Sequence, residues 1–252
     1  MSDNLLIVEN LTKIYEGNTA AVQGISFAVP AGATYGLLGG NGAGKTTTLS
    51  MILGLLTPTS GKITIFDEDM PKQKRSLLAR MNFSSPYVDM VGNLSVKENL
   101  IVFAHLYGLR DYKQRIDSLI TSLQLEKFLN RQVRSLSAGQ ITRTSLAKSL
   151  INTPRLLVLD EPTASLDPDT ADWVRTHLEN YQREQNATIL LASHNMGEVE
   201  RMCNNILMMQ NGKIVDRGTP RALIDKYGRQ NMEEVFLHIS RQGAIGMVEE
   251  AA

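Results

Sequence analysis

The chain has 252 residues, 42% of them hydrophobic and 21% charged, which is ordinary for a globular protein with a sizeable core. Lysine plus arginine and aspartate plus glutamate number 26 each, so a net charge of zero gives no general attraction to nucleic acid or anionic membranes. The single cysteine, Cys203, excludes an internal disulfide and is typical of a reducing compartment. We expect it to be a buried, small apolar residue.

The first ten residues, MSDNLLIVEN, carry acids where a secretory signal would have a basic region, and their apolar stretch is too short for one. Apolar runs such as 156–159 and 189–192 have the length of strands. None approaches the roughly eighteen residues that a membrane helix needs. We therefore expect a soluble chain, in which any membrane role depends on a partner.

Strand and helix patterns alternate along much of the chain, which predicts an α/β fold with a mostly parallel sheet covered on both faces. Turn residues bound the short apolar runs, and the pair Asn211-Gly212 is a strong hairpin signal. The predicted strands are Leu5–Glu9, Ile25–Val29, Thr34–Leu38, Lys62–Phe66, Leu156–Asp160, Thr188–Ala192, Ile206–Gln210 and Lys213–Asp216, and the predicted helices Lys45–Leu55, Pro168–Arg183 and Met196–Met202.

Between Ser95 and Leu150 the strand signals vanish, which predicts a helical subdomain inserted at about residues 87–150 of a domain spanning 5–237. The tail from 222 to 241 reads as two short helices, and residues 238–252 form a C-terminal tail whose last residues should fray. The predicted helices of the insertion are Val96–Tyr107, Tyr112–Leu123 and Ala138–Leu150.

Residues 39–46 match the pattern GxxxxGK[ST] between an apolar run and a predicted helix. Glycines there let backbone N–H groups surround phosphate oxygens, and the helix N-terminus adds positive potential. Lys45 would reach the β- and γ-phosphates, Thr46 would bind Mg²⁺ and Thr47 would contact the α-phosphate region. A glycine-rich turn without a ligand is the poorer alternative. The motif reads Gly39-Gly40-Asn41-Gly42-Ala43-Gly44-Lys45-Thr46.

The run from Leu156 to Pro162 ends in Asp160-Glu161. A strand that is apolar throughout is buried on both faces, so its first acid emerges at the carboxyl edge of the sheet, where ligands bind. Asp160 can then hold a metal through water, and Glu161 can act as a general base on a water that attacks the γ-phosphate. Such acids can also simply start a loop, but after a phosphate loop they favour nucleotide hydrolysis.

A second short motif, Leu136-Ser137-Ala138-Gly139-Gln140, opens a predicted helix ahead of that strand. With the phosphate loop and the acidic strand end, it resembles the signature, usually LSGGQ, of the ATP-binding cassette (ABC) family. The resemblance covers about residues 5–220 and departs from the commonest signature at Ala138. It implies a P-loop NTPase fold of the RecA-like kind, with a mostly parallel sheet core, an N-terminal antiparallel β part and an inserted helical subdomain.

The family assigns a role in a dimer to this signature. By resemblance, the Ser137 hydroxyl and the Gly139 N–H, with Ala138 and Gln140 beside them, approach the γ-phosphate bound to the opposite subunit, assisted by the dipole of the following helix. A serine before a helix is also a good N-cap. We expect Ser137 to serve both purposes.

Three further residues match positions of the same family. Asp167, in Ser165-Leu166-Asp167, matches the loop that contacts the second subunit. His194 matches the switch histidine that touches the γ-phosphate and orients the attacking water. Tyr15 matches the aromatic residue that stacks on adenine, although an isolated tyrosine is usually a packing residue, so this match rests mainly on its position.

One position departs from the family pattern. A glutamine that senses Mg²⁺ and water normally sits just before the helical subdomain, and the corresponding residue here is Pro86, which has no side-chain donor and no N–H. Either a neighbour such as Ser84, Ser85 or Asp89 takes over, or hydrolysis is tuned differently. We expect slower or differently coupled hydrolysis.

The resemblance implies an ATPase with Mg²⁺ as cofactor, which binds ATP at the interface of a head-to-tail dimer. Its partners would be a second ATP-binding subunit, expected to be a copy of itself although a paralogue is open, and a membrane-spanning permease. Residues 99–109 and 233–237 look like those of bacterial drug- and polysaccharide-export ATPases, which favours export. The chain would then be cytoplasmic and peripheral, held on the inner face of the cell membrane through its permease.

Two other classes of protein remain to be weighed. A soluble, non-transport ABC protein acting on ribosomes or nucleic acid is the first, but such proteins generally carry two cassettes or a long coiled-coil insertion, and no basic patch stands out here. A regulatory module without turnover is the second, against which Glu161 argues. Direct contact with nucleic acid is not expected, and the transported substrate cannot be deduced from this chain.

Overall fold

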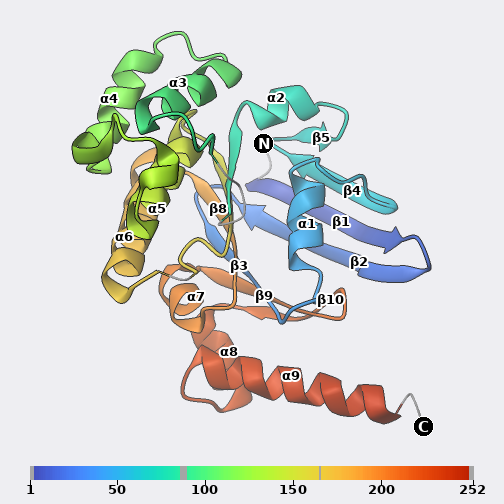
Figure 1. Ribbon diagram of the computed structural model, residues 1–252. Coiled ribbons are helices and arrows are strands. Elements are labelled where there is room, and N and C mark those ends of the chain that lie inside the picture. Colours follow the sequence, from blue (N-terminus) through green and yellow to red (C-terminus); the bar gives the residue numbers. More distant parts are fainter. Residues whose placement is uncertain (1–2, 86–89, 165, 250–252) are drawn as a thin grey trace. The chain divides into compact units, whose positions relative to one another are not determined.

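The computed structural model describes residues 3–85, 90–164 and 166–249 (Figure 1). The chain forms two compact units, one combining Met1–Leu77 with Thr188–Ala252 and the other spanning Leu78–Ala187. The second unit is wider than the helical insertion predicted at about residues 87–150, whose bounds as a subdomain stay a prediction. The two units are described in turn.

The first unit contains an antiparallel sheet in the order β2-β1-β4-β5. Its strands are β1 (Asn4–Tyr15), β2 (Thr19–Pro30), β4 (Ser60–Ile65) and β5 (Glu68–Met70). β1 runs well past the predicted Leu5–Glu9 because irregularities in its pairing, between Val8 and Leu11 and again between Leu11 and Lys13, accommodate the polar residues that break the alternation. The short acidic strand β5 carries no apolar signal and was not predicted.

The same unit holds the parallel strands that precede the phosphate loop and the switch histidine. β3 (Thr34–Leu38) pairs in parallel with β8 (Thr188–Ser193) and with β9 (Asn205–Gln210). β9 returns antiparallel into β10 (Lys213–Gly218) through Asn211 and Gly212, whose φ angles of 48° and 75° suit a tight hairpin turn. The hairpin predicted from the Asn-Gly pair is thus confirmed.

Helices α1 (Lys45–Ile52), α7 (Met196–Met202), α8 (Pro220–Tyr227) and α9 (Met232–Glu249) complete this unit, and the short α2 (Lys74–Leu78) ends its N-terminal stretch. α1 stops three residues before the predicted Leu55, near Gly54, whose φ is 64°. The tail does contain two helices, but α9 is far longer than predicted. It contacts α7 and α8, and its C-terminal part extends away from them (Figure 1).

The second unit consists mainly of helices around a parallel pair of strands, β6 (Met81–Ser84) and β7 (Leu156–Asp160). β6 was missed because Asn82 and Ser84 alternate with only two apolar residues. Asn82 is nevertheless buried and donates to Asn152 Oδ1 at 2.8 Å, which satisfies its amide. The helices are α3 (Val96–Leu106), α4 (Tyr112–Ser122), α5 (Ala138–Leu150) and α6 (Pro168–Gln185), with 3-10 turns at Glu126–Phe128 and Val133–Ser135.

Side-chain caps define where several helices begin. Ser95 and Glu98 form a capping box at the start of α3. The N–H and the hydroxyl of Ser95 both donate to the Glu98 carboxylate, and these two hydrogen bonds lower the pKa of Glu98. Ser137 and Gln140 form a second capping box at the start of α5. Because these caps satisfy backbone donors that a helix start leaves open, the predicted first residues of α3, α5, α6 and α7 agree with the structure.

Cys203 is buried and free, as expected, and burial raises the pKa of its thiol. Its Sγ lies against Gly36 in β3, where an added Cβ would come within 2.9 Å of the sulfur and 3.2 Å of Val199 Cγ1. The strand that leads to the phosphate loop therefore packs on α7 with no room for a side chain.

We expect Gly36→Ala to lower the free energy of unfolding by about 1–3 kcal/mol, because the new methyl overlaps the Cys203 sulfur. Cys203→Ala in the same chain should recover at least about 0.5 kcal/mol of that loss, since it removes the overlapping atom. Urea unfolding of the two single variants and the double variant measures this coupling. Strictly additive effects would contradict the proposed overlap.

Candidate functional site

The glycine loop at residues 39–44 connects β3 to α1, and two of its glycines are required by the fold. A Cβ on Gly39 would lie 2.5 Å from the Met209 carbonyl oxygen, and one on Gly44 would lie 2.5 Å from the Ala21 carbonyl oxygen. Gly44 also has a φ of 103°, which side-chain-bearing residues rarely adopt. Backbone on both sides therefore fixes the path of this loop.

Gly40 and Gly42 face a different environment. No atom of the described residues lies within 4 Å of a Cβ built on either glycine. Gly42 has a φ of 78°, which explains its glycine, but Gly40 needs none for conformation or for packing. A bare backbone that faces open space suits close approach by a ligand, as in loops that hold phosphate through N–H groups.

The residues after the loop divide between internal and accessible positions. Lys45 is buried, and its ammonium donates to the carbonyl oxygens of Gly39 at 2.6 Å and Gly40 at 3.2 Å, which holds the charge at the loop. The Thr48 hydroxyl donates to the Gly44 carbonyl at 2.8 Å, within the helix. Thr46 is exposed and Thr47 half-buried, so these two hydroxyls are the ones accessible to a ligand.

His194 directly follows β8 and is exposed. The turn that carries it is fixed by a buried hydrogen bond of 2.7 Å from the Ser193 hydroxyl to Glu198 Oε2. The Asn195 N–H donates to the Ser193 hydroxyl at 3.0 Å, and the Asn195 side chain caps α7 by accepting from the Glu198 N–H. The role of Ser193 and Glu198 was missed, because nothing in their spacing distinguishes them from surface residues.

Tyr15 is the last residue of β1 and is 44% exposed. The Lys13 ammonium lies 5.4 Å from the centre of its ring and donates to the Thr57 carbonyl at 2.9 Å. A cation near an aromatic ring interacts favourably with its π-system. Tyr15 is thus a solvent-accessible ring, which is what stacking on a planar base requires.

In the second unit, Asp160 and Glu161 stand at the end of β7, all of whose residues are buried. Asp160 is 7% exposed, whereas Glu161 is half-buried and has a φ of 53°. A left-handed conformation in a residue other than glycine is sparsely populated, costs about 1–3 kcal/mol and tends to occur at functional sites. The backbone of Glu161 is therefore held in a strained conformation by the strand end.

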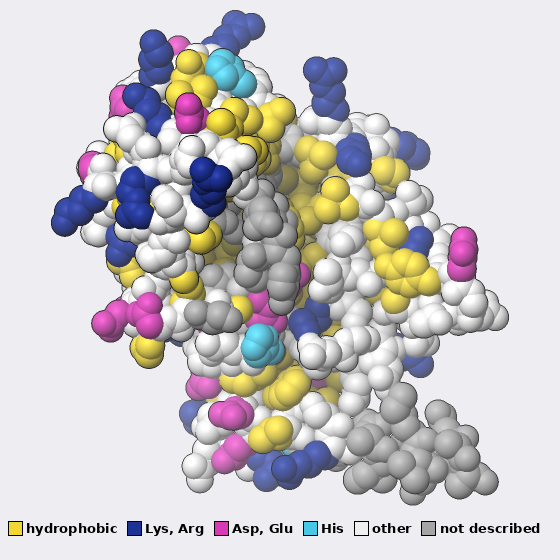
Figure 2. Space-filling model, in the orientation of Figure 1, with side chains coloured by type: hydrophobic (Ala, Val, Ile, Leu, Met, Phe, Trp, Pro, Cys, Tyr) yellow, Lys and Arg dark blue, Asp and Glu magenta, His cyan; other side chains and the backbone are white. Residues whose placement is uncertain are grey.

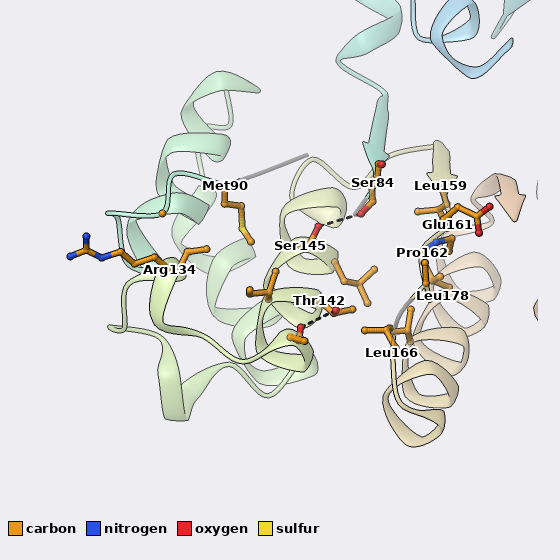
Figure 3. A pocket seen from close by; sticks show the side chains of 18 residues that line it. Ser84, Met90, Arg134, Thr142, Ser145, Leu159, Glu161, Pro162, Leu166 and Leu178 are labelled. Atoms are coloured by element: carbon orange, nitrogen blue, oxygen red, sulfur yellow. Dashed lines mark hydrogen bonds between the residues drawn. The ribbon is translucent and has the colours of Figure 1, made fainter. Parts of the chain in front are cut away.

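Glu161 also lines a cavity of about 520 Å³ within this unit (Figure 3). Ser84 and Ser85, at the end of β6, line the same cavity, and the hydroxyls of Ser84 and Ser145 lie 3.3 Å apart. Pro86 and Asp89 lie outside the described residues, so the substitute for the missing glutamine stays a prediction. Of the two described candidates, Ser84 is paired with Ser145 of α5, and Ser85 is buried.

The signature peptide begins α5 as expected of a cap. The Gln140 N–H donates to the Ser137 hydroxyl at 3.4 Å, and the Ser137 N–H donates to Gln140 Oε1 at 3.1 Å. A Cβ on Gly139 would meet Thr170 Oγ1 at 3.5 Å and Thr170 Cγ2 at 3.8 Å, which are ordinary contacts. Like Gly40, Gly139 is therefore not required by packing among the described residues.

Asp167 caps α6, because its carboxylate accepts from the Thr170 N–H at 3.0 Å. Hydrogen bonds from Thr170 lower the pKa of this carboxyl group. Ser165, in the same loop, lies outside the described residues. The predicted contact of Asp167 with a second subunit stays a prediction.

The predicted residues fall into two sets. The first unit contains Tyr15, Gly39–Thr47 and His194, and the second contains Ser137–Gln140, Asp160, Glu161 and Asp167. The members of each set stand at strand ends or at helix starts. Asp160 and Glu161 at the end of β7, and the loop after β3, agree with the rule that ligands bind at the carboxyl edge of α/β sheets. The supporting residues of each set, such as Ser193 with Glu198, are what sequence reasoning did not find.

Comparison with known sequences gives a consistent result. Residues 22–164 match the profile of the family described as ABC transporter. Nod factor export ATP-binding protein I of Bradyrhizobium diazoefficiens is 37% identical over 222 residues, which cover 87% of this chain and 72% of that protein.

Solved structures show the same fold. A structure described as the ATP binding subunit of an ABC transporter covers 94% of this chain and 99% of its own, with a TM-score of 0.85 and 25% identity. CbiO1 of Clostridium perfringens, described as part of the ABC transporter complex cbiONQ, covers 98% of this chain and 100% of its own, with a TM-score of 0.80 and 27% identity. The α/β fold predicted from the sequence is thus confirmed.

We expect two neighbouring glycines of the loop to differ sharply in their effect on stability. Gly39→Ala should lower the free energy of unfolding by at least about 2 kcal/mol, because the Met209 carbonyl oxygen cannot move away without disturbing β9. Gly40→Ala should change it by less than about 0.5 kcal/mol. Chemical unfolding of both variants without ligand checks this, and equal losses would show that the loop path is not set by β9.

Proposed function

Because the chain belongs to the ABC transporter family, we propose that it is the subunit that binds and hydrolyses ATP to drive a separate membrane-spanning partner. The observation that carries this proposal is the loop at residues 39–46, in which packing does not require the glycine at position 40. The backbone of Gly40 is therefore open to a ligand. Lys45 adds a charge fixed at the same loop by two carbonyl oxygens. Phosphate oxygens are the ligand that such an arrangement suits.

The family pattern suggests a role for each of these residues in the reaction. Lys45 binds the β- and γ-phosphates, and Tyr15 stacks on adenine with its exposed ring. Glu161 accepts a proton from the attacking water as general base, and His194 contacts the γ-phosphate and orients that water. The positive φ of Glu161 supports its role, because strained backbone tends to occur at functional sites. The hydrogen bonds of Ser193 and Asn195 support the role of His194, because they fix the backbone on either side of it.

The chemistry of the donors fits Mg²⁺, which prefers oxygen ligands and usually binds proteins through one or two carboxylates and substrate phosphates. The Thr46 hydroxyl and the Asp160 carboxylate, directly or through water, would hold it. When bound, this ion neutralises charge on the β- and γ-phosphates. Thr46 is exposed, and Asp160 ends a strand buried along its length, so each presents its oxygen at the end of a rigid element.

A second ATP-binding subunit completes the site in this proposal, and it is expected to be another copy of the chain. The signature residues Ser137 and Gly139 would approach the γ-phosphate held by that copy, and Asp167 would contact it. The ordinary contact distance to Thr170 supports this role, because a glycine that packing does not require is explained by a ligand that approaches its backbone. Ser137 caps the same helix, since its hydroxyl accepts from the Gln140 N–H.

No helix among residues 3–85, 90–164 and 166–249 is long and apolar enough to cross a membrane. We infer a permease partner from the family, and export from relatives that are named as export proteins. Exposed apolar side chains on α3, Val102 and Leu106, lie one helical turn apart and provide a surface for such a partner. The chain would thus work in the cytoplasm, on the inner face of the membrane.

A soluble ATPase acting on ribosomes or nucleic acid is the competing function. Figure 2 shows, on the face that it draws, Lys and Arg side chains dispersed among acidic, apolar and other side chains. Nucleic-acid binding proteins instead gather positive charge into a patch or stripe. The net charge of zero and the export relatives favour the transporter.

We expect Glu161→Gln to lower ATP hydrolysis by at least about 100-fold, because the amide cannot accept the proton of water. ATP binding should persist, so this variant should form an ATP-dependent dimer. Phosphate release and light scattering at saturating MgATP measure both properties. Lys45→Ala is the matched control and should neither bind ATP tightly nor dimerise. A Glu161→Gln chain that binds ATP yet stays monomeric would contradict the shared site.

We expect Gly139→Ala to fold normally, because Thr170 leaves ordinary contact distance for a methyl group. ATP affinity of the monomer should be unchanged, since this residue serves the ATP of the other subunit. Hydrolysis and ATP-dependent dimerisation should fall by about 10-fold or more, because the methyl group blocks the approach to phosphate. Unchanged hydrolysis would show that Gly139 has no role across the interface.

A further inference from the structure

We propose that Gln23 is a positioning residue for the nucleotide, which sets the separation between the Tyr15 ring and the phosphate loop. This inference rests on the proposed function, because it assigns Tyr15 to the base and residues 39–46 to the phosphates. Gln23 is exposed and lies in β2. Gln23 belongs to the same compact unit as Tyr15 and the loop at residues 39–46, the two parts of the site that it would connect.

Gln23 lies at an irregularity of the strand pair that carries Tyr15. β1 and β2 pair Lys13 with Val22 but Leu11 with Ile25, so β2 has one extra residue over this interval. Such a bulge takes a residue out of the regular ladder and redirects its polar groups. The neighbouring Gly24 has a φ of 65°, and its N–H donates to the Thr12 hydroxyl at 3.0 Å.

The groups of Gln23 that leave the ladder bind the turn between β9 and β10. Its backbone N–H donates to the Gly212 carbonyl at 2.8 Å, and its side-chain Nε2 donates to the Asn211 carbonyl at 2.7 Å. Two consecutive carbonyl oxygens of one turn therefore accept from one residue. The turn lies close on β2, because a Cβ on Gly212 would come within 2.8 Å of the Ala21 carbonyl oxygen.

The turn between β9 and β10 also binds the phosphate loop. The Gly212 N–H donates to the Ala43 carbonyl at 3.1 Å, and β9 just before the turn supplies the Met209 carbonyl that packs on Gly39. Gln23 is thus joined to the loop through a single turn. Its other covalent neighbours lead along β2 to Thr19, which pairs with Tyr15.

This path has a mechanical consequence. Tyr15 lies at the hairpin end of the β1–β2 pair, where β1 also contacts the segment before β4, because the Ile14 N–H donates to the Thr59 hydroxyl at 3.0 Å. The contacts between β2 and the loop tie this end of the pair to the phosphate loop. A base and a triphosphate are covalently linked, so both ends of a nucleotide bind well only when the two protein surfaces are correctly spaced. Loss of the Gln23 side-chain bond should therefore weaken ligands that use both ends, and spare those that use one.

The test compares ADP with pyrophosphate, which fills the phosphate loop but has no base. Titration calorimetry on the full chain with Mg²⁺ gives the ratio of the two affinities. For Gln23→Ala we expect ADP binding to weaken about three- to tenfold and pyrophosphate binding to stay unchanged, while the midpoint of urea unfolding falls only as far as one exposed hydrogen bond contributes to stability. Gln23→Lys keeps a donor for the Asn211 carbonyl and should restore the ratio, whatever its charge adds to both affinities.

Equal weakening of ADP and pyrophosphate in Gln23→Ala, or no change in either, would overturn the proposal. A ratio that Gln23→Lys fails to restore would do the same, because the side-chain donor would not be the cause. The proposed function fails separately if ADP binds the unaltered chain no more tightly than pyrophosphate does. It also fails if Tyr15→Ala leaves the ratio of the two affinities unchanged.

Discussion

The phosphate loop is confined between two stretches of backbone, and the rest of the site depends on that contact. Carbonyl oxygens of Met209 in β9 and of Ala21 in β2 lie 2.5 Å from where a Cβ on Gly39 or on Gly44 would be, so glycine lets strand and loop pack directly on each other. The inner side of the loop therefore packs against β9 and β2. Its outer side, at Gly40, is left bare, and there the N–H groups can be offered to a ligand.

The glycines of this chain are therefore of two kinds, those that packing requires and those that it does not. At Gly36, Gly39 and Gly44 it answers an internal neighbour, a sulfur or a carbonyl oxygen. At Gly40 and Gly139 the described residues place nothing that a methyl group would strike at close range. The second kind marks the surfaces on which ATP and a second subunit are proposed to act, and only the structure separates it from the first.

Much of the fold could be predicted because its signals are local. β7 is apolar over its first four residues and ends in an acid, and the starts of α3, α5 and α6 carry capping side chains, so these elements agree with prediction. β6 and the extension of β1 to Tyr15 could not be predicted, because Asn82 and the bulged residues of β1 are satisfied by partners distant in sequence. The loop motif likewise indicated Lys45 and Thr46, whereas the Ser193–Glu198 bond and the Gln23 contacts exist only once the chain has folded.

The positive φ of Glu161 sets folding stability against catalytic activity at one position. Glycine at that position would adopt the same backbone angle without steric cost, so a variant selected only for resistance to heat would drift towards losing the carboxylate. The glutamate at this position therefore fits the proposal that the chain hydrolyses ATP and does not merely bind it. A similar chain with a small residue at this position would then be a candidate for a cassette that binds ATP without hydrolysing it.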